Sequence, residues 1–183
     1  LDCYVNVTNN YYGNPNSNHD MGKMAKKIID DANLKIANIL NVNPDEIIYT
    51  SGATESNNLA ILGASYQYKN FGNHILVSSL EHNSVMSSCL RLQEEGFEVE
   101  IIPVNKDGIV DIDVLKSMIR PTTILVSVTS VDSELGIKQP IEEIGKVLKN
   151  YDHIIFHTDA SQAIGKINID IQNADLVTIA PHK

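Results

Sequence analysis

The stretch that decides the fold is residues 153–183, HIIFHTDASQAIGKINIDIQNADLVTIAPHK. Its two apolar runs, IIF and LVTI, are each interpreted as a strand. Asp159 lies just past the first run, and His182 and Lys183 follow the second. Because the carboxyl ends of parallel strands meet at one edge of a sheet, this stretch predicts a site built from both strand ends.

The same alternation of strand and helix extends back through most of the chain. Apolar runs indicate the strands, and apolar residues spaced three and four apart indicate the helices. Strands that alternate with helices predict an α/β fold: a mostly parallel sheet flanked by helices on both faces, in three α/β/α layers. Residues 1–12 lack a pattern and are expected to be an irregular lead-in. Further strands are predicted at residues 46–50, 74–79, 97–104 and 123–129, and helices over residues 21–39, 55–68, 85–92, 112–119 and 140–148.

Composition and charge exclude several classes of protein. The chain has 183 residues, enough for one full α/β domain, and 43% hydrophobic with 20% charged residues is ordinary for a globular protein. A net charge of −9 without a basic cluster argues against nucleic-acid binding. No apolar run approaches the roughly 18 residues of a membrane span, and no signal-peptide pattern opens the chain, so we expect a cytoplasmic protein with no membrane partner.

No metal site is expected. Cys3 and Cys89 lie far apart and form no C-x-x-C motif. His153 and His157 are four residues apart, but in a strand that spacing separates them by roughly 13 Å, too far to share a metal.

Both ends of the sequence look cut. Leu1 is not an initiator Met, and Lys183, the most reactive candidate, is the last residue. We therefore expect residues 1–183 to be one incomplete large domain, lacking its start and a C-terminal small domain.

Polar residues follow four of the predicted strands. Thr54, His82, Asp159 and Lys183 each come after a strand end, so all four are expected at the same edge of the sheet. The convergence of these residues, rather than any one of them, indicates a binding site.

The first two of these residues each allow two interpretations. Ser51-Gly52-Ala53-Thr54 joins a strand to a helix whose N-terminus suits a phosphate, but ordinary capping by Ser51 or Thr54 is the commoner role. His82 can stack on an aromatic cofactor or carry protons, yet it can also be a capping or loop histidine, or an ion-pair partner of Glu81.

Asp159 and Lys183 suggest a specific chemistry when taken together. A pyridine cofactor is an electron sink while its ring nitrogen is protonated, and a buried carboxylate favours that form. A lysine in a partly desolvated site can attack the cofactor's aldehyde. The pair predicts pyridoxal phosphate (PLP) held by Lys183 as a Schiff base, although each residue alone fits a solvated turn or surface position.

The sequence resembles the NifS/IscS-like cysteine desulfurases, in the class V aminotransferase group of PLP enzymes. The matches are collinear and cover nearly the whole chain. They are GNPNSNH at 13–19, EIIYTSGATESNNL at 46–59, Glu81-His82, Asp107-Gly108, RPTT at 120–123, QPI at 139–141, HTDASQA at 157–163, Gly165-Lys166 and His182-Lys183.

The resemblance implies a role for each matched residue. Ala53 and Thr54 would hold the cofactor phosphate with help from His182, and His82 would stack on the ring and move protons. Asp159 would pair with the ring nitrogen, Gln162 would contact the phenolic oxygen, and Lys183 would be the Schiff-base lysine. The resemblance also implies the PLP fold-type I large domain and a homodimer.

Three departures from the family pattern bear on activity. The family's NNE is Asp132-Ser133-Glu134 here, so the Asn that usually helps bind the substrate carboxylate is Ser133. An acid at 132 near that pocket is expected to influence substrate choice. Ala180 replaces a Ser that contacts the phosphate, a contact for which Thr178 could substitute.

The third departure is that the family's catalytic cysteine and substrate-binding arginine would lie beyond Lys183. Cys3 and Cys89 do not match that cysteine, and Cys89 fits the apolar face of a helix.

The leading hypothesis is a PLP-dependent cysteine desulfurase that takes sulfur from L-cysteine, leaving alanine and an enzyme persulfide for a sulfur-acceptor scaffold in iron–sulfur or thio-cofactor assembly. Another class V enzyme, an aminotransferase or a selenocysteine lyase, is the alternative. An inactive fragment acting as a binding partner in iron–sulfur assembly is a third hypothesis.

Overall fold

A five-stranded sheet is the centre of residues 50–183 in the computed structural model, which describes residues 1–183. Its spatial order is β2-β1-β3-β4-β5, and every neighbouring pair is parallel. β1 and β3 are buried along their whole length, as expected for parallel strands covered on both faces. The strands are β1 (His74–Ser78), β2 (Glu98–Ile102), β3 (Thr123–Ser127), β4 (Ile155–Asp159) and β5 (Leu176–Thr178).

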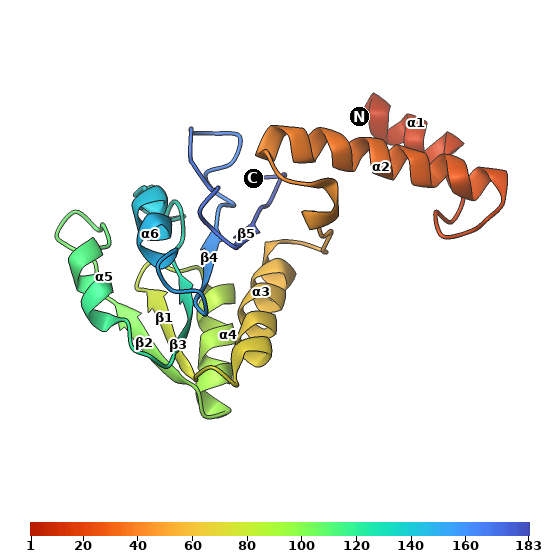
Figure 1. The fold of residues 1–183 in the computed structure, drawn as a ribbon. Helices are drawn as coiled ribbons and strands as arrows, with labels where there is room; N and C mark the ends of the chain where they lie inside the picture. The colour runs from red at the N-terminus through yellow and green to blue at the C-terminus, as the bar shows by residue number, and fades with distance from the viewer. The chain divides into compact units, whose positions relative to one another are not determined.

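Helices cover both faces of this sheet, which confirms the predicted three-layer α/β/α fold (Figure 1). On one face α3 (Ala53–Tyr68) and α4 (Asn83–Glu94) pack on a core that includes Ile75 and Val77. On the other face α5 (Ile112–Met118) and α6 (Ile141–Leu148) pack on a core that includes Leu76 and Phe156. Alternate residues of β1 therefore enter different cores, as the two-residue period of a strand requires.

The strand order places the functional edge of the sheet. After β1 the chain first adds β2 on one side and then returns to add β3, β4 and β5 on the other. Ligands of open parallel sheets bind beyond the carboxyl ends of the strands, where the order reverses. In this sheet that point lies between β1 and β3.

Residues 1–49 form a separate unit of two helices and a short 3-10 turn. The predicted helix over residues 21–39 is α2 (Asp20–Leu40), which begins at a His19 cap and ends at Asn41 in the left-handed region, φ 55°. The expectation of an irregular lead-in over residues 1–12 is wrong, because α1 (Asp2–Asn10) lies there. Its Asn and β-branched residues are poor helix formers, but Asn10 bonds back to Asn6 one turn earlier and Asp2 stands in the favourable first turn.

The strand predicted at residues 46–50 is also absent. Asn43 and Glu46 instead form a capping box around the 3-10 turn η1 (Pro44–Glu46). Ile48 and Tyr49 are 71% and 59% exposed, so burial supplies no reason for the segment to join a sheet. Apolar, β-prone residues alone did not decide the structure here.

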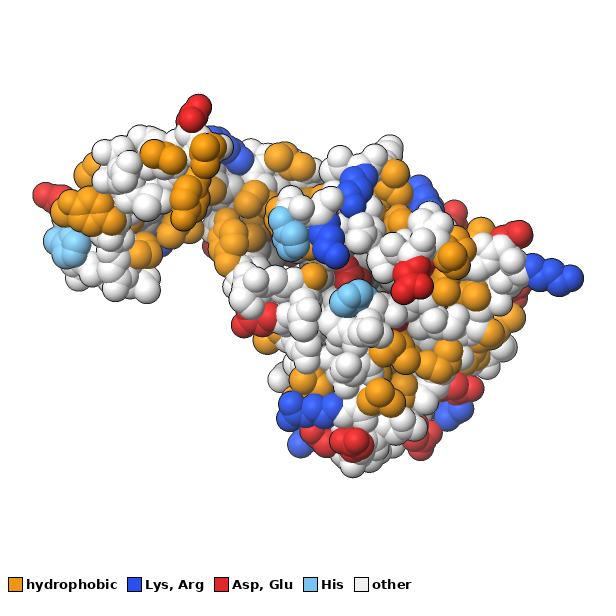
Figure 2. Space-filling model, turned by 180° about the vertical axis from the view of Figure 1, so that it is seen from behind, with side chains coloured by type: hydrophobic (Ala, Val, Ile, Leu, Met, Phe, Trp, Pro, Cys, Tyr) orange, Lys and Arg blue, Asp and Glu red, His pale blue; other side chains and the backbone are white.

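The surface carries mixed charge. In the view of Figure 2, Lys and Arg side chains lie scattered, with acidic side chains among them. None of the helices combines the length and the apolar character that a transmembrane span needs.

A substitution in the loop before β1 can test how closely the backbone packs at the amino end of the sheet. A Cβ added to Gly72 would lie 2.1 Å from the Thr122 carbonyl oxygen, so Gly72→Ala should lower the free energy of unfolding by about 1–3 kcal/mol. On the exposed side of α3, Gly63 has open space around it, and Gly63→Ala should raise that free energy by about 0.5–1 kcal/mol. Urea unfolding of both variants measures the difference; an unchanged Gly72→Ala protein would contradict the packing.

Candidate active site

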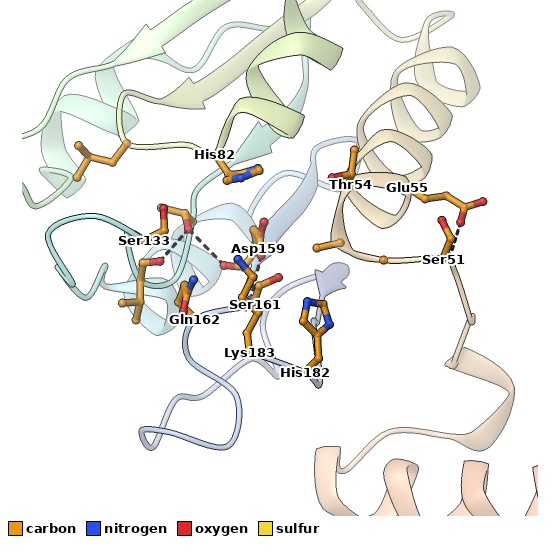
Figure 3. Close-up of a pocket in the computed structure, with 15 residues that line it drawn as sticks. Ser51, Thr54, Glu55, His82, Ser133, Asp159, Ser161, Gln162, His182 and Lys183 are labelled. Atoms are coloured by element: carbon orange, nitrogen blue, oxygen red, sulfur yellow. Dashed lines mark hydrogen bonds between the residues drawn. The ribbon is translucent and has the colours of Figure 1, made fainter. Parts of the chain in front are cut away.

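One pocket at the carboxyl edge of the sheet brings the predicted site residues together (Figure 3). Its volume is about 300 Å³, and its lining comes from the start of α3, the end of β4, and the segments after β1, β3, β4 and β5. Every site residue predicted from the sequence lines it: Ala53, Thr54, His82, Asp159, Gln162, His182 and Lys183.

Asp159 is the most firmly held of these residues. It is the last residue of β4 and is 6% exposed. One carboxylate oxygen accepts a hydrogen bond from Asn57 Nδ2 at 2.7 Å, and the other accepts from the Ser161 N–H at 2.9 Å. Two donors compensate for burying the charge and fix the direction of the carboxylate. In the view of Figure 3, Asp159 lies between His82 and Lys183.

His82 is a capping histidine, one of the interpretations offered by the sequence, and it also lies in the pocket. It is the N-cap of α4, where its Nδ1 accepts from the Ser84 N–H at 3.2 Å, and its ring also lines the pocket. Since Nδ1 is an acceptor, the neutral ring carries its hydrogen on Nε2. The alternative interpretation, an ion pair with Glu81, is wrong, because that carboxylate bonds to Ser78 Oγ and to the Thr129 N–H.

The start of α3 forms another wall of the pocket. The N-cap is Gly52, which has no side chain to accept from the first turn, so neither Ser51 nor Thr54 caps the helix as expected. The Ser51 N–H donates to the Glu55 carboxylate at 2.6 Å, and this bond lowers the pKa of that carboxyl. A helix N-terminus of this kind, with Thr54 in its first turn, suits an anion.

Gln162, His182 and Lys183 also line the pocket. Gln162 Oε1 accepts from Lys166 Nζ at 2.7 Å, which leaves the amide hydrogens of Gln162 to act as donors. His182 and Lys183 follow β5 in a turn held by the Lys183 N–H bond to the Ala180 carbonyl at 3.0 Å. Both side chains are exposed.

Thr178 and Asp132, two residues connected with the departures from the family pattern, do not lie where the sequence suggested. Thr178 is 2% exposed, and its hydroxyl pairs with His157 Nε2 at 3.2 Å. It is therefore not free to make the phosphate contact of the family's Ser, whose place Ala180 takes in this chain. Asp132 accepts from the Glu134 N–H at 3.2 Å, and its carboxylate holds a turn instead of lining the pocket. Ser133 does line the pocket.

Sequence analysis missed two residues that support the site. Asn57 lies in α3 with 0% exposure and contacts both Asp159 and Ser84, which is itself 6% exposed and bonded to His82. The available signal was an Asn on the inner face of a helix, one turn before Ile61 and two before Ser65, all of them buried. A buried amide needs partners, so its position on that face indicated a polar contact.

Two buried titratable groups lie near the pocket. Burial raises the pKa of Glu81 to about 7, and its Oε2 is buried without a hydrogen-bond partner. Burial lowers the pKa of His157 to about 4, and its ring joins Ser127 on β3 to Thr178 on β5. A neutral imidazole fits that core position.

Comparisons with known proteins show the family and the fold of this chain. The family model "Aminotransferase class-V" matches residues 1–183. The chain belongs to this family. The cysteine desulfurase IscS of Ehrlichia chaffeensis is 49% identical over 175 residues, covering 94% of this chain and 42% of that protein. The human cysteine desulfurase is 44% identical over 186 residues, covering 100% of this chain and 40% of that protein.

Two solved structures are similar to this chain over nearly its whole length. A structure titled "SspA in complex with cysteine" has a TM-score of 0.93 and 35% identity, and covers 100% of this chain and 53% of that one. A "NIFS-like protein" has a TM-score of 0.89 and 32% identity, covering 95% and 49%. The chain thus spans about two fifths of its curated relatives, 42% and 40% of the two named, and about half of these structures.

The two buried groups predict opposite effects of pH on stability. The folded-state pKa of Glu81 is raised from 4.5 to about 7, so its contribution is fully present below pH 4.5 and is lost as pH rises through 7. The folded-state pKa of His157 is lowered from 6.5 to about 4, so its contribution is present above pH 6.5 and is lost as pH falls through 4. Between these limits the two effects oppose each other.

Single substitutions of Glu81 and His157 should separate their two effects on stability. From pH 4.5 to 6.5 the free energy of unfolding of Glu81→Gln should rise relative to wild type by about 2–3 kcal/mol, and that of His157→Gln should fall by a similar amount. Urea unfolding at several pH values measures both slopes, and groups common to all three proteins cancel in the difference. Slopes parallel to wild type in both variants would contradict the assignment.

Proposed function

We propose that this pocket binds PLP covalently at Lys183 and that the whole protein is a cysteine desulfurase acting on L-cysteine. The observation that carries the proposal is the convergence of Asp159, His82 and Lys183 on one pocket from three strand ends. The names of the similar proteins support the same activity.

The residues fit the cofactor. Asp159 is a buried carboxylate in the pocket, suited to a protonated pyridine nitrogen. The start of α3 with Thr54 suits the phosphate group, and the free amide hydrogens of Gln162 suit a phenolic oxygen. A volume of about 300 Å³ is at the lower end of the range for small-molecule sites.

Bound PLP would supply an electron sink for negative charge that develops on the substrate. Lys183 Nζ would hold the cofactor and then carry a proton between substrate atoms. His82 would stack on the cofactor ring, and its Nε2 would be the nitrogen free to exchange a proton, because Nδ1 is already bonded to Ser84. Asp159 would keep the ring nitrogen protonated through its fixed carboxylate.

The sulfur transfer balances with one additional thiol. The Cβ–Sγ bond of L-cysteine breaks, an S–S bond forms between that sulfur and an enzyme thiol, and alanine leaves with the hydrogen that the thiol gave up. Cys89 does not suit this role, since it is 1% exposed and burial raises the pKa of its thiol to about 12. We assign the thiol to a part of the longer protein outside this chain, which would act as a homodimer and pass the sulfur to an acceptor scaffold.

Another class V activity is the second candidate. Ser133 lines the pocket at the position where the cysteine desulfurases have an Asn for the substrate carboxylate. The difference therefore lies where it would affect which substrate binds. An aminotransferase or selenocysteine lyase would share the cofactor residues.

The cofactor proposal predicts the effect of Lys183→Ala in the full-length protein. After borohydride reduction, mass spectrometry of peptides should locate the cofactor adduct on Lys183 in wild type and find none in Lys183→Ala, because no other amine lines the pocket. Lys149→Ala, an exposed lysine at the end of α6, is the control and should keep the adduct. An adduct that persists in Lys183→Ala would refute the assignment.

The substrate proposal predicts the products. With L-cysteine and a reducing thiol, the holoenzyme should release sulfide and alanine in equal amounts, because the carbon skeleton loses only sulfur. Accumulation of a keto acid in place of alanine would indicate an aminotransferase. A clear preference for selenocysteine over cysteine would indicate a lyase.

A further inference from the structure

Asn57 connects two residues of the pocket without lining it. It lies in α3, is 0% exposed, and donates from Nδ2 to Asp159 Oδ2 at 2.7 Å and to Ser84 Oγ at 2.9 Å. An amide nitrogen carries only two hydrogens, so this group uses both of them. The acceptors lie 102 and 27 residues away in the sequence, at the end of β4 and in the first turn of α4.

The amide can face these acceptors in only one orientation. Turning it over would bring Oδ1 against the Asp159 carboxylate, and two acceptors repel each other. In the orientation observed, Asn57 Oδ1 is buried without a hydrogen-bond partner. An unsatisfied buried oxygen is destabilising, so the two bonds from Nδ2 must be what this position contributes.

The bonds continue to His82 with a defined direction. Ser84 Oγ accepts from Asn57, so its own hydrogen is free to point to His82 Nδ1, 2.8 Å away. The Ser84 N–H also donates to Nδ1. Both bonds require Nδ1 to lack a hydrogen, which leaves the hydrogen on Nε2.

We propose that Asn57 is a positioning residue that holds Asp159 and, through Ser84, His82 in a fixed relation on either side of the pocket. One amide sets the direction of the carboxylate and selects the Nε2–H form of the imidazole. The inference rests on the proposed function for its consequence, since these are the two groups assigned to the cofactor ring. The hydrogen-bond network consists only of this chain's own residues.

The direction of the network can be tested without cofactor. In full-length protein labelled with ¹⁵N-histidine, long-range ¹H–¹⁵N spectra of the apo form near neutral pH should identify His82 as the Nε2–H form. The signal is assigned by its loss in His82→Gln. A hydrogen found on Nδ1 would overturn the proposal, whether or not the protein proves to be a desulfurase.

The link to Asp159 is tested by cofactor affinity. Asn57→Ala should weaken PLP binding by about tenfold to a hundredfold, the range for a lost hydrogen bond to a charged group. Gln67→Ala, on the exposed face of α3, is the control and should change affinity by less than about threefold, well below the Asn57→Ala effect. Circular dichroism verifies that each variant is folded. Equal affinities for Asn57→Ala and wild type would overturn the proposal.

Asn57→Asp supplies a readout that a purely structural role would not move. Two carboxyl groups at this distance can bond only while they share a proton, so the affinity of Asn57→Asp should approach wild type at low pH and fall about tenfold or more as pH rises. The other titratable groups around Asp159 are the same in both proteins and cancel in the ratio of affinities. They are Glu81, His82, His157, His182 and Lys183.

Gln67→Glu adds the same charge to the exposed face of α3 and is the matched control, with a ratio to wild type that stays flat with pH. A flat ratio for Asn57→Asp as well would overturn the role of the amide. If wild type itself fails to bind PLP, the proposed function fails, while the His82 measurement still decides the network.

Discussion

The buried carboxylate of Asp159 is the constraint on which the site depends. A charge at 6% exposure must be hydrogen-bonded, and its two donors come from α3 and from the turn just after β4. Satisfying that charge requires α3 to pack against the end of β4 with the Asn57 amide turned toward it. The same packing brings the N-terminus of α3 to the pocket. One electrostatic requirement thereby joins the two sides of the proposed cofactor site.

The topology of the sheet supplies the rest of the pocket. Because all five strands are parallel and the order reverses between β1 and β3, the segments after β1, β3 and β5 emerge at one edge beside the end of β4. Each segment contributes polar residues to the pocket, while β1 and β3 are buried along their whole length. A catalytic site needs such a rigid core, because the core holds the reacting side chains in place.

A second polar layer lies beneath the pocket. His157 bridges Ser127 and Thr178 across three strands, and it points to the same side of β4 as Asp159, two residues later. Burial holds His157 neutral, while Glu81, bonded to the Thr129 N–H, resists losing its proton. Burial therefore favours the neutral forms of both groups.

Local pattern determined much of this protein. The runs at β1 and β3 and the apolar face of α4 are short-range features, and each was predicted at its place because the spacing of apolar residues acts over a few residues. His82, Asp159 and Lys183 follow or end strands, which was enough to predict that they would meet, whereas Thr54 reaches the pocket from the start of α3 without a strand before it. The same reasoning failed at residues 1–12 and 46–50, where side-chain bonds and exposure outweighed propensity.

Only the tertiary structure decided what holds the site residues in place. Asn57 acquires its role from a carboxylate 102 residues away, and no periodicity within α3 specifies that partner. Likewise Thr178 pairs with His157, and Asp132 closes its own turn, because the nearest available donors and acceptors in three dimensions satisfy them first. Sequence predicted the chemistry at the strand ends; the pairing of buried polar groups depends on distances that only the folded chain establishes.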